Sequence, residues 1–238
     1  MPTETPVDLS GRSVLVTGAA GGLGRLISRG LADAGAKLTL VGRDEASLRN
    51  LGLDGAAVAS VDLTTPDGPE RAVQAAVQAH GGLGGVVHAA GVVAFGPVAE
   101  VDDDTVDELF LLNALAPLRL LRAAAAPLTE AAATHGDAFL VTISGVVAEK
   151  PAAHMAAYSA SKAASWALAS AATGELRRAK VRVLDARPPH TETGLATHPV
   201  AGNAPRLPRG LEPADVAARI VAAILAGERD LPTSAFQA

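Results

Sequence analysis

Short runs of apolar residues alternate along the chain with longer stretches in which apolar residues recur at helical spacing. The short runs predict buried strands, because a strand covered on both faces is apolar throughout, whereas a helix buries one stripe. The expected strands are 13–18, 37–43, 56–62, 84–91, 137–144 and 181–188. The expected helices are 22–35, 69–80, 102–128, 156–178 and 213–227, and the segment 229–236 is expected to add an edge strand.

This alternation of strands and helices predicts right-handed βαβ units around one parallel sheet. No linker, repeat or low-complexity block divides the chain, so we expect a single doubly wound α/β domain over residues 1–238, of Rossmann type, with helices on both faces of the sheet. The segment 191–210 is rich in proline and glycine. A loop of that length in a compact domain is usually functional or disordered, and we expect this one to close over a substrate.

Composition narrows the choice of partners. The net charge is −5 with both signs mixed along the chain, aromatic residues make up 3%, and there is no cysteine. These values argue against nucleic acid, a membrane surface and disulfides as features of this protein. The histidines lack metal-ligand spacing, and the first ten residues are polar and acidic, unlike a signal peptide. We expect a cytoplasmic protein that acts on a small molecule.

Three glycines stand between the first expected strand and the first expected helix. The sequence VLVTGAAGGLGRL places Gly18, Gly22 and Gly24 there. Glycines in this position let backbone N–H groups and a helix N-terminus approach a pyrophosphate closely. A glycine motif alone is weak evidence, but the strand before it and the helix after it supply the context that a dinucleotide site requires.

A tyrosine and a lysine share one face of the expected helix 156–178. Tyr158 is the only tyrosine of the chain, and Lys162 follows one helical turn later. The phenol has a reference pKa of about 10, so proton transfer near neutral pH calls for a shift of up to roughly three units. We expect the ammonium of Lys162 to favour the phenolate and lower that pKa.

The glycine spacing and the Tyr158–Lys162 pair together resemble the short-chain dehydrogenase/reductase family, and the resemblance covers nearly the whole chain. It implies that Asn113 belongs to the catalytic group with Ser144, Tyr158 and Lys162, and that Lys162 also holds the cofactor ribose. Pro189 stands where the family has a glycine after the sixth strand. The cofactor-binding residues expected from the motifs are Gly18, Gly22, Leu23, Gly24, Arg43, Asp62, Leu63, Ala89, Ala90, Gly91, Tyr158, Lys162, Pro188 and Thr193.

The residue after the second strand bears on the choice between the two nicotinamide dinucleotides. Arg43 stands there, and Asp44 follows. A guanidinium suits a 2′-phosphate, whereas an acid would hydrogen-bond the ribose 2′-hydroxyl. We therefore expect NADP(H). If Asp44 turns toward the ribose instead, the cofactor is NAD(H). If it does not, Asp44 can cap the next helix.

The position of the catalytic serine is ambiguous. The family serine usually lies thirteen residues before the tyrosine, which is Gly145 here, while Ser144 is one residue further away. Either the connecting loop is one residue longer and Ser144 orients the carbonyl, or Gly145 stands at the serine position and His154, Thr142 or water takes over. We commit to Ser144 facing Tyr158 or the carbonyl, although a one-residue slip turns a strand side chain to the other face.

These features predict an NADP(H)-dependent oxidoreductase that reduces a ketone or aldehyde, or oxidises the alcohol. Tyr158 is the expected acid/base, Lys162 tunes it, and Asn113 supports the proton path. The helices 102–128 and 156–178 match those through which the family pairs its subunits, so a homodimer or homotetramer is expected. Two other classes stay open: a non-redox isomerase, dehydratase or cyclase on the same fold, and a cofactor-binding regulatory protein.

Overall fold

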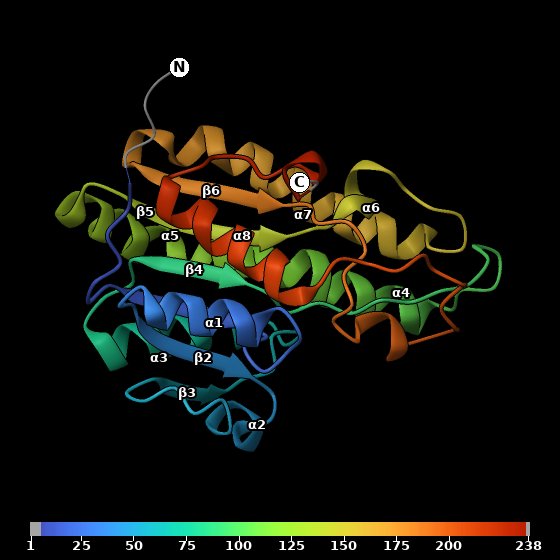
Figure 1. Ribbon diagram of the computed structural model, residues 1–238, viewed down its shortest axis with the longest axis horizontal. Helices are drawn as coiled ribbons and strands as arrows, with labels where there is room; N and C mark the ends of the chain where they lie inside the picture. The colour runs from blue at the N-terminus through green and yellow to red at the C-terminus, as the bar shows by residue number, and fades with distance from the viewer. Residues whose placement is uncertain (1–5, 237–238) are drawn as a thin grey trace.

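Six parallel strands form one sheet in the order β3-β2-β1-β4-β5-β6 in the computed structural model, which describes residues 6–236 (Figure 1). The strands are β1 Ser13–Thr17, β2 Lys37–Gly42, β3 Ala57–Ser60, β4 Gly85–His88, β5 Ala138–Ile143 and β6 Val181–Ala186. This is the strand order of a doubly wound dinucleotide-binding fold, so the predicted fold class is confirmed. The order reverses between β1 and β4, and such a switch point is where these sheets bind ligands.

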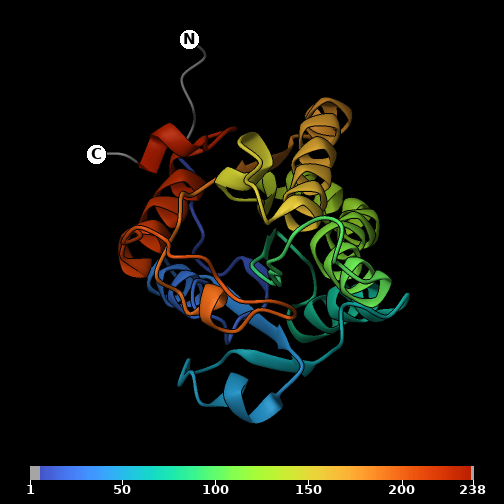
Figure 2. The same ribbon diagram turned by 90° about the vertical axis from the view of Figure 1, so that its right-hand side faces the viewer.

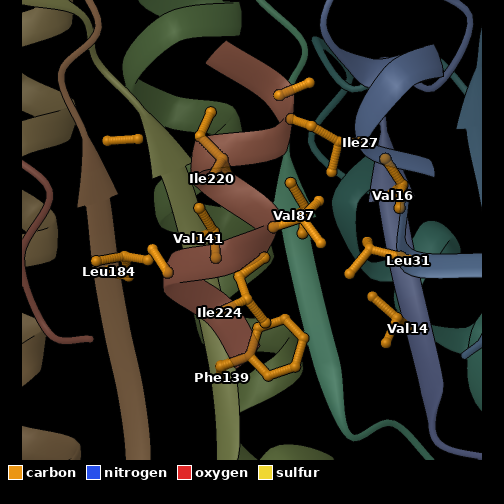
Figure 3. Packing of buried hydrophobic residues seen from close by; sticks show 14 of the residues in the cluster. Val14, Val16, Ile27, Leu31, Val87, Phe139, Val141, Leu184, Ile220 and Ile224 are labelled. Carbon is orange, nitrogen blue, oxygen red and sulfur yellow. The ribbon is translucent and has the colours of Figure 1, made fainter. Parts of the chain in front are cut away.

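Helices cover both faces of the sheet (Figures 1 and 2). One face carries α1 Gly24–Asp33 and α8 Pro213–Ala226, and the other carries α3 Gly68–His80, α5 Ala116–His135 and α7 Ala156–Leu176. The strand β1 shows how the sequence builds two cores. Val14 and Val16 pack toward α1 and α8 (Figure 3), while Leu15 between them packs toward α3 and α5. Alternation along a strand sends successive side chains to opposite faces, and both faces are buried here.

The long helix expected at 102–128 is interrupted and extends further. It consists of α4 Asp103–Phe110, a π-helical turn Leu111–Leu115 labelled η1, and α5, which ends at Gly136 in the left-handed conformation. Pro127 lies inside α5 without ending it. By length and composition alone the run Asp103–His135 could cross a membrane, and 44% of its apolar window is buried inside the fold. Single π turns often mark functional sites.

The prediction of an edge strand at 229–236 is wrong. Leu231 makes one isolated bridge to Ala186, and Thr233–Phe236 then forms a 3₁₀ helix, η4. Pro232 explains the end of pairing, because proline has no N–H group for a sheet ladder. The short helix α2 Glu45–Arg49 was indicated only by its possible cap, Asp44. The helices α6 Val146–Glu149, η2 Arg177–Ala179 and η3 Leu195–Thr197 are too short to show periodicity.

A row of polar residues crosses the sheet at its carboxyl edge. The register pairs Thr17 of β1 with His88 of β4, His88 with Thr142 of β5, and Thr142 with Asp185 of β6. Cross-strand neighbours share a face, and this row faces the side that α7 covers, since the residues preceding each member pack on the opposite side. Figure 2 looks onto this edge, where the segments around α6 and η3 also gather.

Candidate active site

A cavity of about 550 Å³ opens at the carboxyl edge of the sheet. Its wall begins at the glycine turn after β1, passes the ends of β4 and β5, and includes one face of α7. Much of the remaining wall is apolar. Of the residues expected at the site, those lining the cavity are Gly22, Leu23, Ala89, Ala90, Gly91, Ser144, Tyr158, Lys162, Pro188 and Thr193. Gly18 and Gly24 belong to the same glycine turn but do not line the cavity.

The glycine turn is packed so closely that side chains would not fit. A Cβ added to Gly18 would lie 2.6 Å from the backbone of Ala90, and one added to Gly24 would lie 2.1 Å from the carbonyl oxygen of Gly18. A Cβ at Gly22 would meet Thr193 at 2.6 Å. The helix α1 begins here without a side-chain cap, which leaves N–H groups for an anion. These residues fit the pyrophosphate of a dinucleotide.

Tyr158 and Lys162 lie one turn apart near the start of α7, and both side chains are buried. Burial raises the pKa of Tyr158 to about 12. Burial lowers the pKa of Lys162 to about 8, and the charge of Asp185 opposes this shift. The expectation of a lowered phenol pKa is wrong for this structure, because desolvation of the buried phenol raises it. Tyr158 is therefore protonated at neutral pH, as a proton donor must be.

Asn113 lies in the π-helical turn η1 and is buried. Its Nδ2 donates to the carbonyl oxygen of Val92 at 2.9 Å and to Oγ of Ser161 at 3.0 Å, and its Oδ1 accepts from the Val92 N–H. Ser161 in turn donates to the carbonyl oxygen of Tyr158. Asn113 thus joins the segment after β4 to the helix that carries the acid, which is a positioning role for its side chain. Gly91 lets this happen, since a Cβ there would lie 3.1 Å from both Asn113 and Lys162.

The hydroxyl of Ser144 is directed at Asp185, and no hydrogen bond joins it to Tyr158 in the described residues. Ser144 is fully buried at the cavity wall, and its hydroxyl donates to Oδ2 of Asp185 at 2.5 Å. The expectation that Ser144 lies within reach of Tyr158 is therefore wrong, and the reason is strand alternation. Ser144 shares the face of Thr142, which donates to Oδ1 of the same Asp185 at 2.5 Å. The arrangement matches the second alternative, with Gly145 at the serine position.

The residues considered as substitutes for the serine are also accounted for. The hydroxyl of Thr142 donates its hydrogen bond to Asp185. His154 is exposed and does not line the cavity. His88 is buried next to the site, where its Nδ1 lies 2.8 Å from Oγ1 of Thr17. Burial lowers the pKa of His88 to about 3, so it is neutral under ordinary conditions.

An ion cluster surrounds the buried guanidinium of Arg187 at the end of β6, and sequence reasoning missed it. The guanidinium of Arg187 is paired with Asp185 at 3.3 Å, with Asp230 at 2.7 Å and with Glu149. It also lies over the ring of Trp166, 5.3 Å from the centroid. The signal was available in the run VRVLDARP, because a buried parallel strand is expected to be apolar and this one carries an acid and two arginines.

The residues expected to select the dinucleotide lie at the ends of β2 and β3, outside the cavity wall. Arg43 is exposed and close enough to Asp62 for its charge to lower the pKa of that acid, after the larger effect of hydrogen bonds from Thr64. Asp44 caps α2 by accepting from the Ala46 N–H, so the expected capping role is confirmed. The side chain of Leu63 is buried in the core, which leaves only its backbone for contact with a cofactor.

Comparison with known proteins identifies the family. The model of the short chain dehydrogenase family matches residues 12–203. An uncharacterized oxidoreductase of Mycobacterium tuberculosis is 34% identical over 176 residues, which cover 72% of this chain and 64% of the relative. An uncharacterized oxidoreductase of Staphylococcus aureus is 27% identical over 220 residues, covering 91% of this chain and 92% of the relative. The chain belongs to the short-chain dehydrogenase/reductase family of oxidoreductases. Because the match spans less than two thirds of the M. tuberculosis relative, activity and substrate are inferred from the site itself.

Two solved structures extend the comparison. A metagenomic short-chain oxidoreductase in complex with NADP is 30% identical, with a TM-score of 0.78 and coverage of 95% of this chain and 98% of that one. A 3-ketoacyl-(acyl-carrier-protein) reductase from Brucella melitensis, complexed with NADH, has a TM-score of 0.86 over 94% of this chain and 97% of that one. Its identity is 24%, so this likeness shows the fold alone.

Proposed function

We propose that the protein is an NADP(H)-dependent oxidoreductase that reduces a ketone or aldehyde, with Tyr158 as the proton donor. The observation that carries the proposal is the placement of Tyr158 and Lys162 on the wall of a cavity that begins at the glycine turn. When bound, a nicotinamide dinucleotide would supply the hydride. The residues of this chain would hold the carbonyl against Tyr158, whose phenol transfers its proton to the carbonyl oxygen.

The apolar wall supports a substrate with an apolar body. Val93, Phe95, Val147, Met155 and Leu207 contribute side chains to the cavity. Such a surface excludes water from the reacting carbonyl and favours apolar groups on either side of it. Since Gly145 offers no hydroxyl, the carbonyl would depend on Tyr158 for its protein hydrogen bond.

Two observations support NADP(H) over NAD(H). Arg43 is exposed at the end of β2, where it can meet a 2′-phosphate. Asp44, the residue that would select the ribose hydroxyls, has its carboxylate engaged by the Ala46 N–H at 3.0 Å and the Ser47 hydroxyl at 2.5 Å. The NADP complex of the metagenomic relative is consistent with this choice, whereas the NADH complex of the Brucella protein shows that both cofactors occur on this fold.

The experiment is the consumption of NADPH, followed by absorbance, with a panel of ketones and aldehydes that carry apolar groups of increasing size. Turnover that disappears in Tyr158→Phe supports the proposal, while Tyr158→Phe with unchanged turnover contradicts it. The absence of a hydroxyl at Gly145 favours a second candidate, a non-redox reaction on the same fold. That candidate predicts conversion of a substrate with no net change in the dinucleotide.

We also propose that the protein works as a homodimer or homotetramer. Leu115 and Leu118, at the junction of η1 and α5, and Trp166 on α7 are large apolar residues that remain exposed. They lie on the helices through which the family resemblance implies subunit pairing. Analytical ultracentrifugation of the wild type and of Leu118→Glu tests this: dissociation of an oligomer by the substitution supports the interface, and a wild-type monomer contradicts it.

A further inference from the structure

The ammonium of Lys162 is held by a strand end that one carboxylate clamps on both sides. The Nζ of Lys162 donates to the carbonyl oxygen of Ile143 at 2.9 Å. Ile143 lies between Thr142 and Ser144, and the hydroxyls of these two residues donate to the two oxygens of Asp185. The acceptor that orients Lys162 is therefore fixed by hydrogen bonds made immediately before and after it in the chain.

Asp185 is an unusual residue for its place. It belongs to β6, a strand buried on both faces, and its own side chain is 4% exposed. Placing a carboxylate there is costly unless the charge is paired and hydrogen-bonded. Two hydroxyl groups and the guanidinium of Arg187 at 3.3 Å offset part of that cost, while burial still raises the pKa of Asp185 above its ordinary value. Apolar side chains would fill the same space without this cost, so packing alone does not account for the carboxylate.

The charged and titratable groups around Lys162 come from several elements. Tyr158 precedes it on α7 and is neutral, since burial raises its pKa to about 12. His88 at the end of β4 is also neutral, with a pKa of about 3. The turn η1 contributes the uncharged amide of Asn113. Asp185 on β6 is the group whose negative charge acts on Lys162, with Arg187 on its other side.

We propose that Asp185 is a positioning residue of the active site, which clamps the end of β5 through Thr142 and Ser144 and whose charge keeps Lys162 in its ammonium form beside Tyr158. The meaning of Lys162 for catalysis rests on the proposed function, but its protonation can be read directly. In this arrangement the serine before Gly145 serves the lysine instead of the substrate. The hydroxyl that the family directs at the carbonyl is missing, while a carboxylate and two hydroxyls support the lysine.

The test is a pH titration of the full-length protein labelled at the ε-carbon of lysine and followed by NMR. The chain has four lysines, Lys37, Lys150, Lys162 and Lys180, and the signal of Lys162 is assigned from its loss in Lys162→Met. The wild-type midpoint is expected near 8. In Asp185→Asn, which keeps the shape of the side chain, we expect the midpoint to fall by roughly one unit. The alkaline limb of kcat/KM should move to lower pH by the same amount.

Asp230→Asn is the matched control. It removes the same charge from the other side of Arg187, at a side chain that is 64% exposed, and should leave the Lys162 midpoint in place. Asp185→Ser, also neutral and able to hydrogen-bond, replaces Asp185→Asn if that variant does not fold. An unmoved Lys162 midpoint in the folded neutral variant overturns the inference, as does an equal shift in Asp230→Asn. If the midpoint falls as expected but no carbonyl compound consumes NADPH, the proposed function fails and the role of Asp185 stands.

Discussion

The side of the sheet's carboxyl edge that is formed by β4, β5 and α7 buries its polar groups, whereas the side formed by β2 and β3 leaves its charges in solvent. His88, Tyr158 and Lys162 have pKa values shifted chiefly by burial. On the other side, the pKa values of Asp44 and Asp62 are lowered chiefly by hydrogen bonds from side chains close by in the sequence. Burial shifts the pKa of a side chain, and proton transfer depends on such shifts. Exposed charges can select a charged ligand, but dissolved salt weakens these interactions.

The largest expected effect lies on the buried side. Tyr158→Phe should lower turnover by roughly 10²–10⁴-fold, because it removes the proton donor. Fold and cofactor affinity should be retained, which circular dichroism and fluorescence titration with NADPH can check. The variant also abolishes tyrosinate absorbance at high pH, since Tyr158 is the only tyrosine. If turnover persists, the buried side is not a proton-transfer site and the contrast between the two sides loses its catalytic meaning.

The pH dependence of stability sharpens the same contrast. The pKa of Lys162 is about 8 against 10.5 when unperturbed, so between these values the unfolded chain binds more protons and the free energy of unfolding rises with pH. The pKa of Tyr158 is about 12 against 10.0, so between these values the folded state binds more protons and the free energy of unfolding falls. Each effect is worth roughly 3 kcal/mol.

We therefore expect a stability maximum near the crossover of these two windows, measured by urea unfolding over a pH series. Tyr158→Phe should remove the fall at higher pH and keep the rise below it. Tyrosinate absorbance of the wild type should show an apparent pKa well above the ordinary value. A phenol that titrates at its ordinary pKa would contradict the burial of this side.

On the exposed side, Arg43→Ala should weaken NADPH binding about ten- to a hundredfold, because a charge-assisted hydrogen bond contributes roughly 1.5–3 kcal/mol. NADH affinity should change little, and the difference should shrink at high salt. Arg49→Ala is the control, since Arg49 is also exposed but pairs with Glu45 within α2. Isothermal titration with both dinucleotides measures these affinities; equal binding of NADPH and NADH by the wild type would refute the assignment.

The smallest effect is expected at Gly145. Its φ is +76° and its ψ is 169°, a region that is almost restricted to glycine and costs a residue with a side chain roughly 1–3 kcal/mol. The space itself is available, because an added Cβ would lie 3.7 Å from the carbonyl oxygen of Pro188. Gly145→Ser should therefore lower the free energy of unfolding by about that amount and raise carbonyl reduction by up to roughly tenfold. Gly145→Ala separates the two effects: it should share the loss of stability and show no gain in rate.

Much of the fold could be predicted because its signals are local. Apolar runs and glycines mark the strands and turns, and the motif Tyr158-x-x-x-Lys162 indicates one helix face without any knowledge of tertiary structure. The segment at 229–236 failed because Pro232 ends the pairing that Leu231 begins. The one-turn helices could not be predicted, since a single turn carries no period.

The site was less accessible to sequence reasoning, because its decisive contacts join distant strands. The partner of Ser144 lies 41 positions later, and only the register of β5 against β6 brings Asp185 to it. The pKa of Tyr158 depends on how deeply α7 buries the phenol, which spacing does not reveal. The acid and the two arginines in a strand expected to be apolar were the warning in the sequence that a polar cluster lies there.

The stacking of Arg187 on Trp166 has a practical consequence for spectroscopy. Trp166 is the only tryptophan, and the guanidinium over its ring belongs to the ion cluster that includes Asp185. Indole fluorescence responds to a nearby cation and to the polarity around the ring. The emission of the native protein therefore reports on the cluster next to the active site, without any introduced label, and its change during rapid mixing with a ligand would time any rearrangement of that cluster.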